Sequence, residues 1–100
     1  MREWFDGLNS GKLAAGTVTE NFVYRGSDRE LSFDEMNTRV REYRKQYPEL
    51  LFSIDFVVQH ADKVGVAWTA VTRGKSSKGV GTGTLSRGKF SEFTGVMPNL

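Results

Sequence analysis

The stretch that decides the fold is residues 32–60, SFDEMNTRVREYRKQYPELLFSIDFVVQH. In its first half, apolar residues recur at steps of three and four, as they do along one face of an amphipathic α-helix. In its second half, apolar and polar residues alternate, as they do in a β-strand with one buried face. A helix followed directly by strands of this kind predicts the α+β class.

The first half of this stretch has the marks of a complete helix from Phe33 to Tyr47. Ser32 and Glu35 have the spacing of a capping box, in which each side chain accepts a hydrogen bond from a free backbone N–H at the helix start. Pro48 ends the helix because it lacks a backbone N–H and disfavours helical geometry in the residue before it. The apolar stripe consists of Phe33, Met36, Val40, Tyr43 and Tyr47.

Alternation continues after the helix and predicts four strands in two antiparallel hairpins. The strands are expected at Leu51–Gln59, Val64–Ala70, Val80–Ser86 and Lys89–Val96, with turns at residues 60–63 and 87–88 and a polar loop at Arg73–Gly79. Before the capped helix, we expect a short helix around residues 4–8 and a first strand at residues 18–25. Gly81 and Gly83 fall on one face of the third predicted strand, which indicates a bulge, strong curvature or close approach of another backbone.

The composition excludes several kinds of site. The 100 residues include no cysteine and one histidine, so disulfides, thiolate metal sites and a multi-histidine zinc site within one chain are ruled out. The net charge is +2, and acids are interleaved with bases, which argues against a nucleic-acid partner. No apolar run approaches the roughly 20 residues that span a bilayer, and the start does not resemble a signal peptide. We therefore expect a cytoplasmic protein without membrane contact.

Four short stretches occur in the order and spacing found in one known family. They are ENFVYRG at residues 20–26, YPEL at 47–50, DKVGVAWT at 62–69 and GKFSE at 88–92. Together with the order of short helix, strand, capped helix and four strands, they make the chain similar to the SnoaL-like family of the nuclear transport factor 2-like superfamily.

The resemblance implies one SnoaL-like domain over residues 1–100, with a cone-shaped, curved antiparallel sheet packed with helices (the nuclear transport factor 2-like, or cystatin-like, α+β roll). It implies an apolar cavity inside the cone for a small apolar ligand, and a homodimer formed through the outer face of the sheet. Members catalyse polyketide ring closure, steroid isomerisation, epoxide hydrolysis or dehydration, and others bind without chemistry. The fold therefore leaves the reaction open.

The family's catalytic residues are incomplete in this sequence. SnoaL-like cyclases commonly carry a histidine shortly after the Trp-Thr strand, but Trp68 and Thr69 are followed by Val-Thr-Arg-Gly at residues 71–74. Cyclases also tend to place an acid beyond the segment that holds Glu92, and none follows it here. Steroid-isomerase relatives place an aspartate just after the first strand, where only Asp28 is available.

The candidate catalytic residues are therefore Glu92 and Asp28, carboxylates that act as general bases when burial raises their pKa. The competing interpretation is that both are solvated or ion-paired, as most carboxylates are. Histidine is the usual general base at neutral pH, but His60 lies in a predicted turn, away from the expected cavity. No metal or organic cofactor is expected for this chemistry.

The candidate ligand-binding residues are Trp4, Phe22, Tyr24, Trp68 and Phe93. An aromatic set of this kind is compatible with a lined pocket. Plain core packing is the stronger interpretation, because aromatic residues dominate the energetics of cores. The Tyr24 hydroxyl and the Trp68 indole N–H are the two groups in the set able to orient a polar atom of a ligand.

Two functions from different classes remain. The first is a small-molecule-binding domain that acts as a cofactor-independent cyclase, isomerase or hydratase on an apolar carbonyl compound, with Glu92 or Asp28 as base and Tyr24 as donor. The second is a non-enzymatic binding or dimerisation module, which the missing residues favour. Nucleic-acid binding ranks third, because acids are interleaved with the bases of the surface and the bases of the capped helix have Glu35 and Glu42 as partners. The loop at residues 73–79 lacks the P-loop pattern, so no phosphate-binding loop is expected there.

Overall fold

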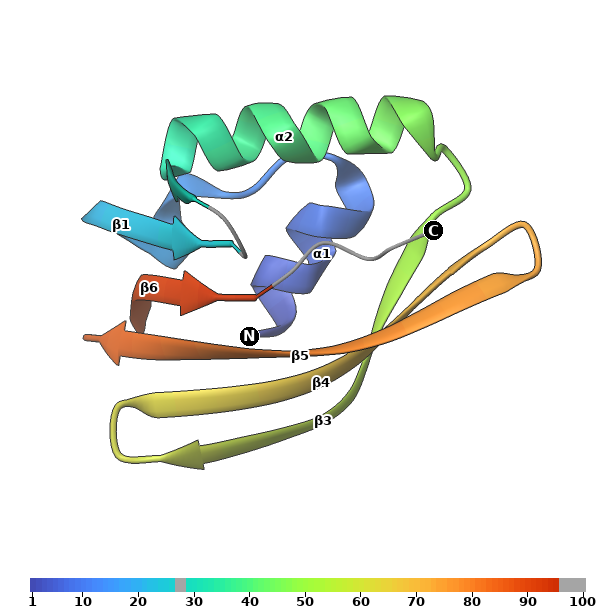
Figure 1. Ribbon diagram of the computed structural model, residues 1–100. Helices are drawn as coiled ribbons and strands as arrows, with labels where there is room; N and C mark the ends of the chain where they lie inside the picture. Colours follow the sequence, from blue (N-terminus) through green and yellow to red (C-terminus); the bar gives the residue numbers. More distant parts are fainter. Residues whose placement is uncertain (27–28, 96–100) are drawn as a thin grey trace.

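The computed structural model describes residues 1–26 and 29–95. Along this part of the chain the elements are α1 (Arg2–Ser10), the short 3₁₀ helix η1 (Ala15–Thr17), β1 (Val18–Arg25), β2 (Glu30–Ser32), α2 (Phe33–Gln46), β3 (Leu51–His60), β4 (Lys63–Thr72), β5 (Lys75–Ser86) and β6 (Lys89–Thr94) (Figure 1).

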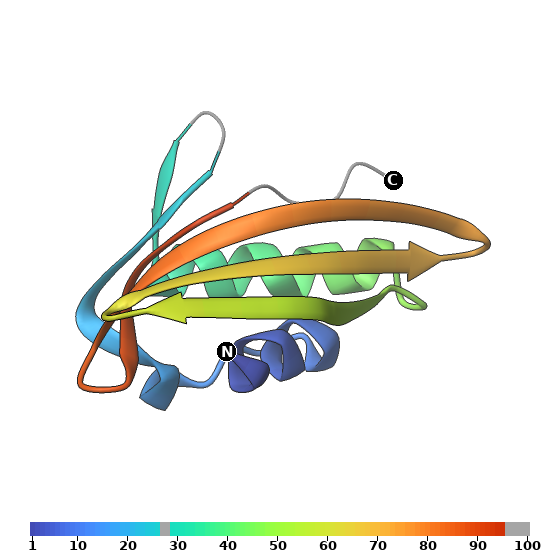
Figure 2. The ribbon, with the colours of Figure 1, turned by 90° about the horizontal axis from the view of Figure 1, so that it is seen from below.

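The described strands form one curved sheet, and both helices lie on its concave side (Figures 1 and 2). The strand order is β2-β1-β6-β5-β4-β3. Neighbouring strands are antiparallel except β1 and β6, which run parallel. The predicted α+β cone of sheet and helices is confirmed, with one parallel pair that joins the first strand to the last.

Helix α2 begins with the capping box that the sequence predicts. The backbone N–H of Glu35 donates to Ser32 Oγ at 3.2 Å, and the backbone N–H of Ser32 donates to Glu35 Oε1 at 3.0 Å. The helix ends at Gln46, one residue before the expected end. Met36 and Val40 are buried, so the apolar stripe faces the sheet. Neither helix in the described part of the chain has the length and apolar character needed to cross a bilayer.

Several strand bounds differ from the prediction. β3 ends at His60, β4 spans Lys63–Thr72 and β6 ends at Thr94, each within two residues of the expected ends. β5 begins at Lys75, so the expected loop at residues 73–79 is only the turn Arg73-Gly74, whose φ angles are 49° and 78°. Residues 75–78 are polar, yet they pair in register with residues 69–72 of β4. Backbone ladder hydrogen bonds hold this arm. Ser77 is half-buried opposite the buried Ala70, but residues 75–78 are all polar, so the sequence shows no apolar alternation there. The three-residue β2 was also not predicted, because it is too short to show a period.

Glycines make room for aromatic rings on the inner face of β5. A Cβ atom at Gly79 would lie 2.6 Å from Trp68 Cη2, and one at Gly81 would lie 2.7 Å from Phe93 Cε1. At Gly83 the corresponding atom would lie 2.7 Å from Phe90 Cε1. The predicted close approach is therefore made mainly by side-chain rings. The pairing of β5 with β4 is regular along these glycines, so neither Gly81 nor Gly83 marks a bulge in that ladder.

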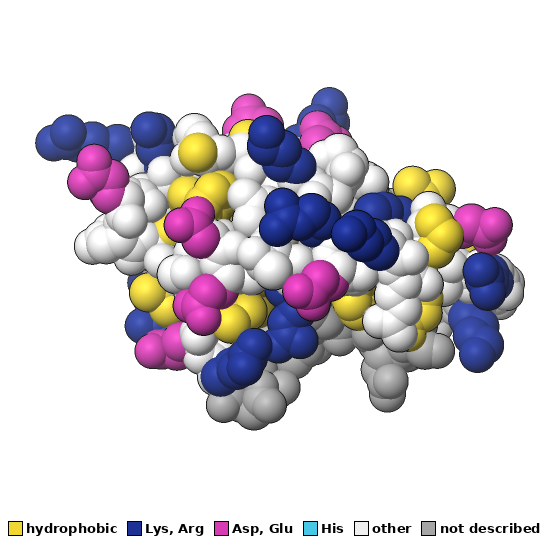
Figure 3. All heavy atoms as spheres, turned by 90° about the horizontal axis from the view of Figure 1, so that it is seen from above, with side chains coloured by type: hydrophobic (Ala, Val, Ile, Leu, Met, Phe, Trp, Pro, Cys, Tyr) yellow, Lys and Arg dark blue, Asp and Glu magenta, His cyan; other side chains and the backbone are white. Residues whose placement is uncertain are grey.

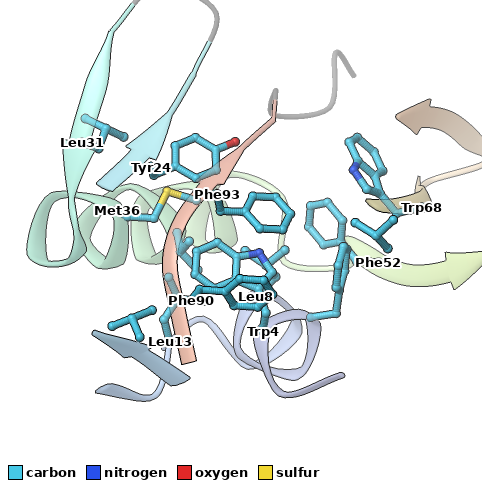
Figure 4. Packing of buried hydrophobic residues seen from close by; sticks show 14 of the residues in the cluster. Trp4, Leu8, Leu13, Tyr24, Leu31, Met36, Phe52, Trp68, Phe90 and Phe93 are labelled. Carbon is cyan, nitrogen blue, oxygen red and sulfur yellow. The ribbon is translucent and has the colours of Figure 1, made fainter. Parts of the chain in front are cut away.

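Trp4 of α1 lies at the centre of the core (Figure 4). Its ring centroid is 5.1 Å from that of Phe93, 5.6 Å from that of Phe22 and 6.4 Å from that of Tyr24. These partners lie on β1 and β6, so the parallel strand pair and the first helix share one aromatic cluster. Aromatic packing of this kind is what holds α1 against the sheet.

Two polar side chains fix α1 to the segments around it. The Asn9 amide donates to the Phe52 carbonyl at 3.0 Å and accepts from the Phe52 N–H at 2.7 Å. Because β3 is an edge strand, this amide replaces a neighbouring strand at one residue. The Arg44 guanidinium donates to the carbonyls of Leu8, Pro48 and Leu50, and desolvation lowers the pKa of Arg44.

Candidate functional site

The interior of the cone is filled by side chains. The cavity that remains there has a volume of about 20 Å³, enough for about one water molecule. Its lining consists of Trp4, Phe5, Leu8, Tyr24, Met36, Phe52, Trp68, Phe93 and Gly95. This lining is almost wholly apolar, so the interior suits an apolar molecule and not an ion.

All five predicted aromatic residues are brought together in one buried cluster. Four of them line the small cavity, whereas Phe22 packs between Trp4 and Phe33 with centroid distances of 5.6 and 6.4 Å. Their role in ligand binding stays a prediction, because in this structure they pack against one another.

Two polar groups belong to this aromatic lining. Burial raises the pKa of Tyr24 to about 12, with a smaller opposing effect from Arg39, so the phenol stays a neutral hydrogen-bond donor near neutral pH. Neither the Tyr24 hydroxyl nor the Trp68 indole N–H has a hydrogen-bond partner among residues 1–26 and 29–95. Figure 4 shows Tyr24 on β1 at one side of the cluster and Trp68 on β4 at the other.

Glu92 does lie on a strand that bounds the interior, but its side chain points to the outer face. Its carboxylate accepts hydrogen bonds from Arg25 Nη1 at 2.7 Å and Thr84 Oγ1 at 3.3 Å. The hydrogen bond from Arg25 is the main reason that the pKa of Glu92 is lowered. The arrangement is that of an ion-paired carboxylate and not of a general base with a raised pKa.

The orientation of Glu92 depends on an irregularity in the sheet. Phe90 and Phe93 are both buried although they are three residues apart, which strict alternation does not allow. A register shift at Thr84 and Leu85 of β5 lets both rings reach the core and turns Glu92 outward. One sequence does not disclose such a shift, because it depends on the partner strand.

The remaining predicted titratable residues lie away from the interior. Asp28 is outside the described residues. Asp55 faces outward, as the alternation predicts, and its carboxylate accepts from Thr69 Oγ1 at 2.7 Å. His60 is the exposed last residue of β3. In the described part of the chain, no three acidic or histidine side chains come close enough together to hold a metal ion.

The basic residues of α2 share their surface with acids. Seen from the helix side, Lys and Arg side chains alternate with Asp and Glu over this face (Figure 3). No continuous positive band is visible there, and the predicted solvated helix face agrees with this view.

The outer face of the sheet carries an exposed apolar patch that sequence reasoning did not single out. Its members, called the outer patch below, are Leu51, Phe56, Val58, Val71 and Val80. Val80 is the most exposed, at 70%. The alternation predicts Phe56 and Val58 on the buried face with Phe52, but a register shift between Ile54 and Phe56 turns both outward.

A groove of about 430 Å³ adjoins this patch at the end of the sheet nearest the β3–β4 turn. Val58, Gly65 and Thr82 lie in one row across three strands, and His60, Lys63, Thr84 and Glu92 lie in the next row. The one sequence signal was Gly65, a glycine on the outward face of an alternating strand.

No family model matches the sequence, and no curated protein matches it. Solved structures do match the fold. A candidate isomerase of the SnoaL-like family from Agrobacterium tumefaciens has a TM-score of 0.80 and 14% identity, over 98% of this chain and 93% of that one. IdmH, a candidate polyketide cyclase from Streptomyces antibioticus, has a TM-score of 0.79 and 13% identity, over 94% and 86%.

A candidate ketosteroid isomerase from Kribbella flavida has a TM-score of 0.76 and 16% identity, over 99% of this chain and 75% of that one. Identities this low show a shared fold and leave the function of this chain open.

Proposed function

We propose that this chain, whose fold is that of the SnoaL-like proteins of the nuclear transport factor 2-like superfamily, binds a small apolar molecule in the interior of its cone. One observation carries the proposal. An apolar aromatic lining contains two hydrogen-bond donors, on Tyr24 and Trp68, that have no partner among the described residues. A small number of polar groups in an apolar surround is the usual composition of a small-molecule site.

Binding requires the interior to open. Small-molecule sites commonly have volumes of roughly 300–1,000 Å³, far above the present 20 Å³. Phe52 and Trp68 contact each other edge-on with centroids 5.7 Å apart, and both line the cavity. We expect these rings to move when a ligand enters, so that part of the binding free energy is spent on rearranging them.

The described lining supplies a hydrogen-bond donor and no base. None of its members is a carboxylate or a histidine, whereas proton abstraction needs a base within hydrogen-bond reach of the substrate. We therefore favour binding without chemistry. The cyclase, isomerase or hydratase alternative requires Asp28, or a Glu92 that has left Arg25. If turnover is found, Asp28→Asn abolishes it where Asp28 is the base, and Glu92→Gln abolishes it where Glu92 is the base.

The test of binding is a thermal-shift screen of the 100-residue chain with hydrophobic ketones, lactones and steroids. A compound that binds only the native state raises the melting temperature by mass action. Tryptophan fluorescence then locates the compound, because Trp4 and Trp68 both line the interior. If no compound shifts the melt or changes the fluorescence, the binding proposal fails.

A matched variant tests the polar contact. Tyr24→Phe removes one hydroxyl and keeps the ring, so we expect it to weaken binding of a ketone about 5-fold, which corresponds to about 1 kcal/mol for one hydrogen bond. A hydrocarbon of the same shape should bind both proteins equally. Equal ketone affinities would show that Tyr24 does not orient the ligand.

The outer patch supports a second part of the proposal, a homodimer formed through the outer face of the sheet. Its five members are aliphatic or aromatic and at least 44% exposed. Exposed apolar surface on one face of a sheet is typical of an interaction site. The partner that buries the same kind of surface in return is a second copy of the chain, which has an identical patch.

A further inference from the structure

The groove on the outer face owes its depth to one missing side chain. A Cβ atom at Gly65 would lie 3.2 Å from Val58 Cγ2, so any larger residue at this position would fill the space beside Val58. Gly65 stands opposite Val58 on one side and Thr82 on the other. The floor of the groove is therefore the bare backbone of β4, with an apolar wall on the β3 side.

A row of charged and polar side chains crosses the sheet at one end of this floor. His60, Lys63, Thr84 and Glu92 stand opposite one another on β3, β4, β5 and β6. Lys63 Nζ donates to Thr84 Oγ1 at 2.8 Å, and the Thr84 hydroxyl donates to Glu92 at 3.3 Å. Partners in register point to the same face, so these side chains border one space.

Glu92 and Lys63, the two charged residues of this row, differ in the partners that they have within the chain. Arg25 lies between two carboxylates, 2.7 Å from Glu92 and 2.9 Å from Glu30. Arg25 is the main cause of the lowered pKa of Glu92, and Lys63 also contributes to lowering it. Lys63 lies within 4.0 Å of no carboxylate in the described part of the chain. Its ammonium has three donors and uses one, on Thr84. Lys63 therefore has two donors left for a new partner at the His60 end of the groove, and its charge is shared with Glu92.

We propose that this groove is a second small-molecule site, for a carboxylate attached to a short apolar body. The carboxylate accepts from Lys63 and from the neighbouring His60, and the apolar body lies along Val58 over Gly65. The volume of about 430 Å³ lies within the range of small-molecule sites. An exposed ion pair contributes little, so we expect dissociation constants of about 1 mM, with the apolar contact supplying most of the affinity.

The test is a titration of the ¹⁵N-labelled chain with 3-phenylpropionate and with 3-phenylpropionamide, followed by amide chemical shifts. We expect the carboxylate to shift Lys63, Gly65 and Thr82, and to bind roughly 3- to 5-fold more tightly than the amide. Lys63→Gln should remove this difference between the two compounds. Lys78→Gln is the matched control, because Lys78 is on the same face but pairs with Asp55.

Larger side chains at Gly65 test whether the bare backbone of β4 forms the floor of the binding site. Gly65→Val should abolish binding of both compounds, and Gly65→Ala should weaken it. Equal affinities of the two compounds for the wild-type chain, or full binding by the Gly65→Val variant, would overturn the proposal. The titration is repeated with the Val80→Lys variant. If a second copy covers the groove in the wild-type dimer, this variant exposes the groove and binding becomes detectable. If neither the wild-type chain nor the Val80→Lys variant binds the compounds, the proposal of a groove site is also overturned.

This site is independent of the interior site, and the same spectra keep the two apart. The indole N–H signals of Trp4 and Trp68 report the interior, whereas the amide signals of Gly65 and Thr82 report the groove. A ligand that shifts only the indole signals supports interior binding and contradicts the groove. A ligand that shifts only the amide signals of Gly65 and Thr82 supports the groove site. Binding in the interior is then tested separately by the thermal-shift screen.

Discussion

At the level of single residues, the position of Trp68 depends on Gly79. The indole lies over the bare backbone of β5, at a distance where even a methyl group would collide with it. The same relation holds between Gly81 and Phe93. The aromatic interior is thus as much a product of the glycines on β5 as of the aromatic residues themselves, since the rings need the space that absent side chains leave.

The variant Gly79→Ala should therefore destabilise the fold by about 1–3 kcal/mol, the usual cost of overpacking. Urea denaturation followed by fluorescence measures this cost. Gly16→Ala is the matched control, because no atom lies within 4 Å of a Cβ placed at Gly16. Equal stability of the Gly79→Ala variant and the wild-type chain would mean that Trp68 moves aside without cost.

A second residue-scale prediction concerns the pH dependence of the pair between Glu92 and Arg25. Because Arg25 lowers the pKa of Glu92 in the native state, the pair stabilises the fold fully above the carboxyl pKa of the unfolded chain, about 4.3. The stabilisation is lost as the pH falls through the lower native pKa. The two side chains are 40% and 44% exposed, so we expect at most about 1 kcal/mol.

The measurement compares the unfolding free energies of the wild-type chain and Glu92→Gln at neutral and acidic pH. The variant should be less stable at about pH 7 and equal to the wild type at about pH 2.5, where the carboxyl is protonated. Glu20→Gln, which alters an exposed carboxylate on β1, should have no such effect. A loss of stability that is the same at both pH values would contradict an electrostatic role.

At the level of elements, the side-chain amide of Asn9 hydrogen-bonds α1 to the edge strand β3. Asn9 satisfies both the N–H and the carbonyl of Phe52, which an inner strand would find in its neighbour. Asn9→Ala leaves both groups without this partner, so we expect a loss of about 1–3 kcal/mol in chemical denaturation. Asn21→Ala, on an exposed part of β1, should cost much less. Equal losses would show that water replaces Asn9.

The accuracy of sequence-based prediction also differs between elements. The capping box and stripe of α2 were predictable because they arise within one segment, and the same holds for β1, whose predicted bounds match. The start of β5 at Lys75 was not predictable, because residues 75–78 are all polar even where Ser77 stands opposite the buried Ala70. The outward direction of Glu92 follows from a register shift between two strands, which lies beyond any single segment.

At the level of the whole molecule, the helices leave one face of the sheet uncovered, and the outer patch lies on that face. Val80→Lys places a charge on its most exposed member. We expect this variant to shift self-association toward the monomer in sedimentation velocity, because an unpaired ammonium is costly to bury. Thr38→Lys on α2 adds the same charge on the opposite side and should leave the association unchanged. A monomeric wild-type chain at all concentrations would contradict the dimer.

The strand order has a consequence for how the chain folds. β6 lies between β1 and β5, so the sheet remains in two parts until residues 89–94 are available. The meander of β3, β4 and β5 can pair without β6, whereas β1 has only β2 beside it until β6 is added. The pairing of Val23 with Glu92 closes a separation of 69 residues. Because contacts this distant slow folding, insertion of the last strand is the step expected to limit the rate.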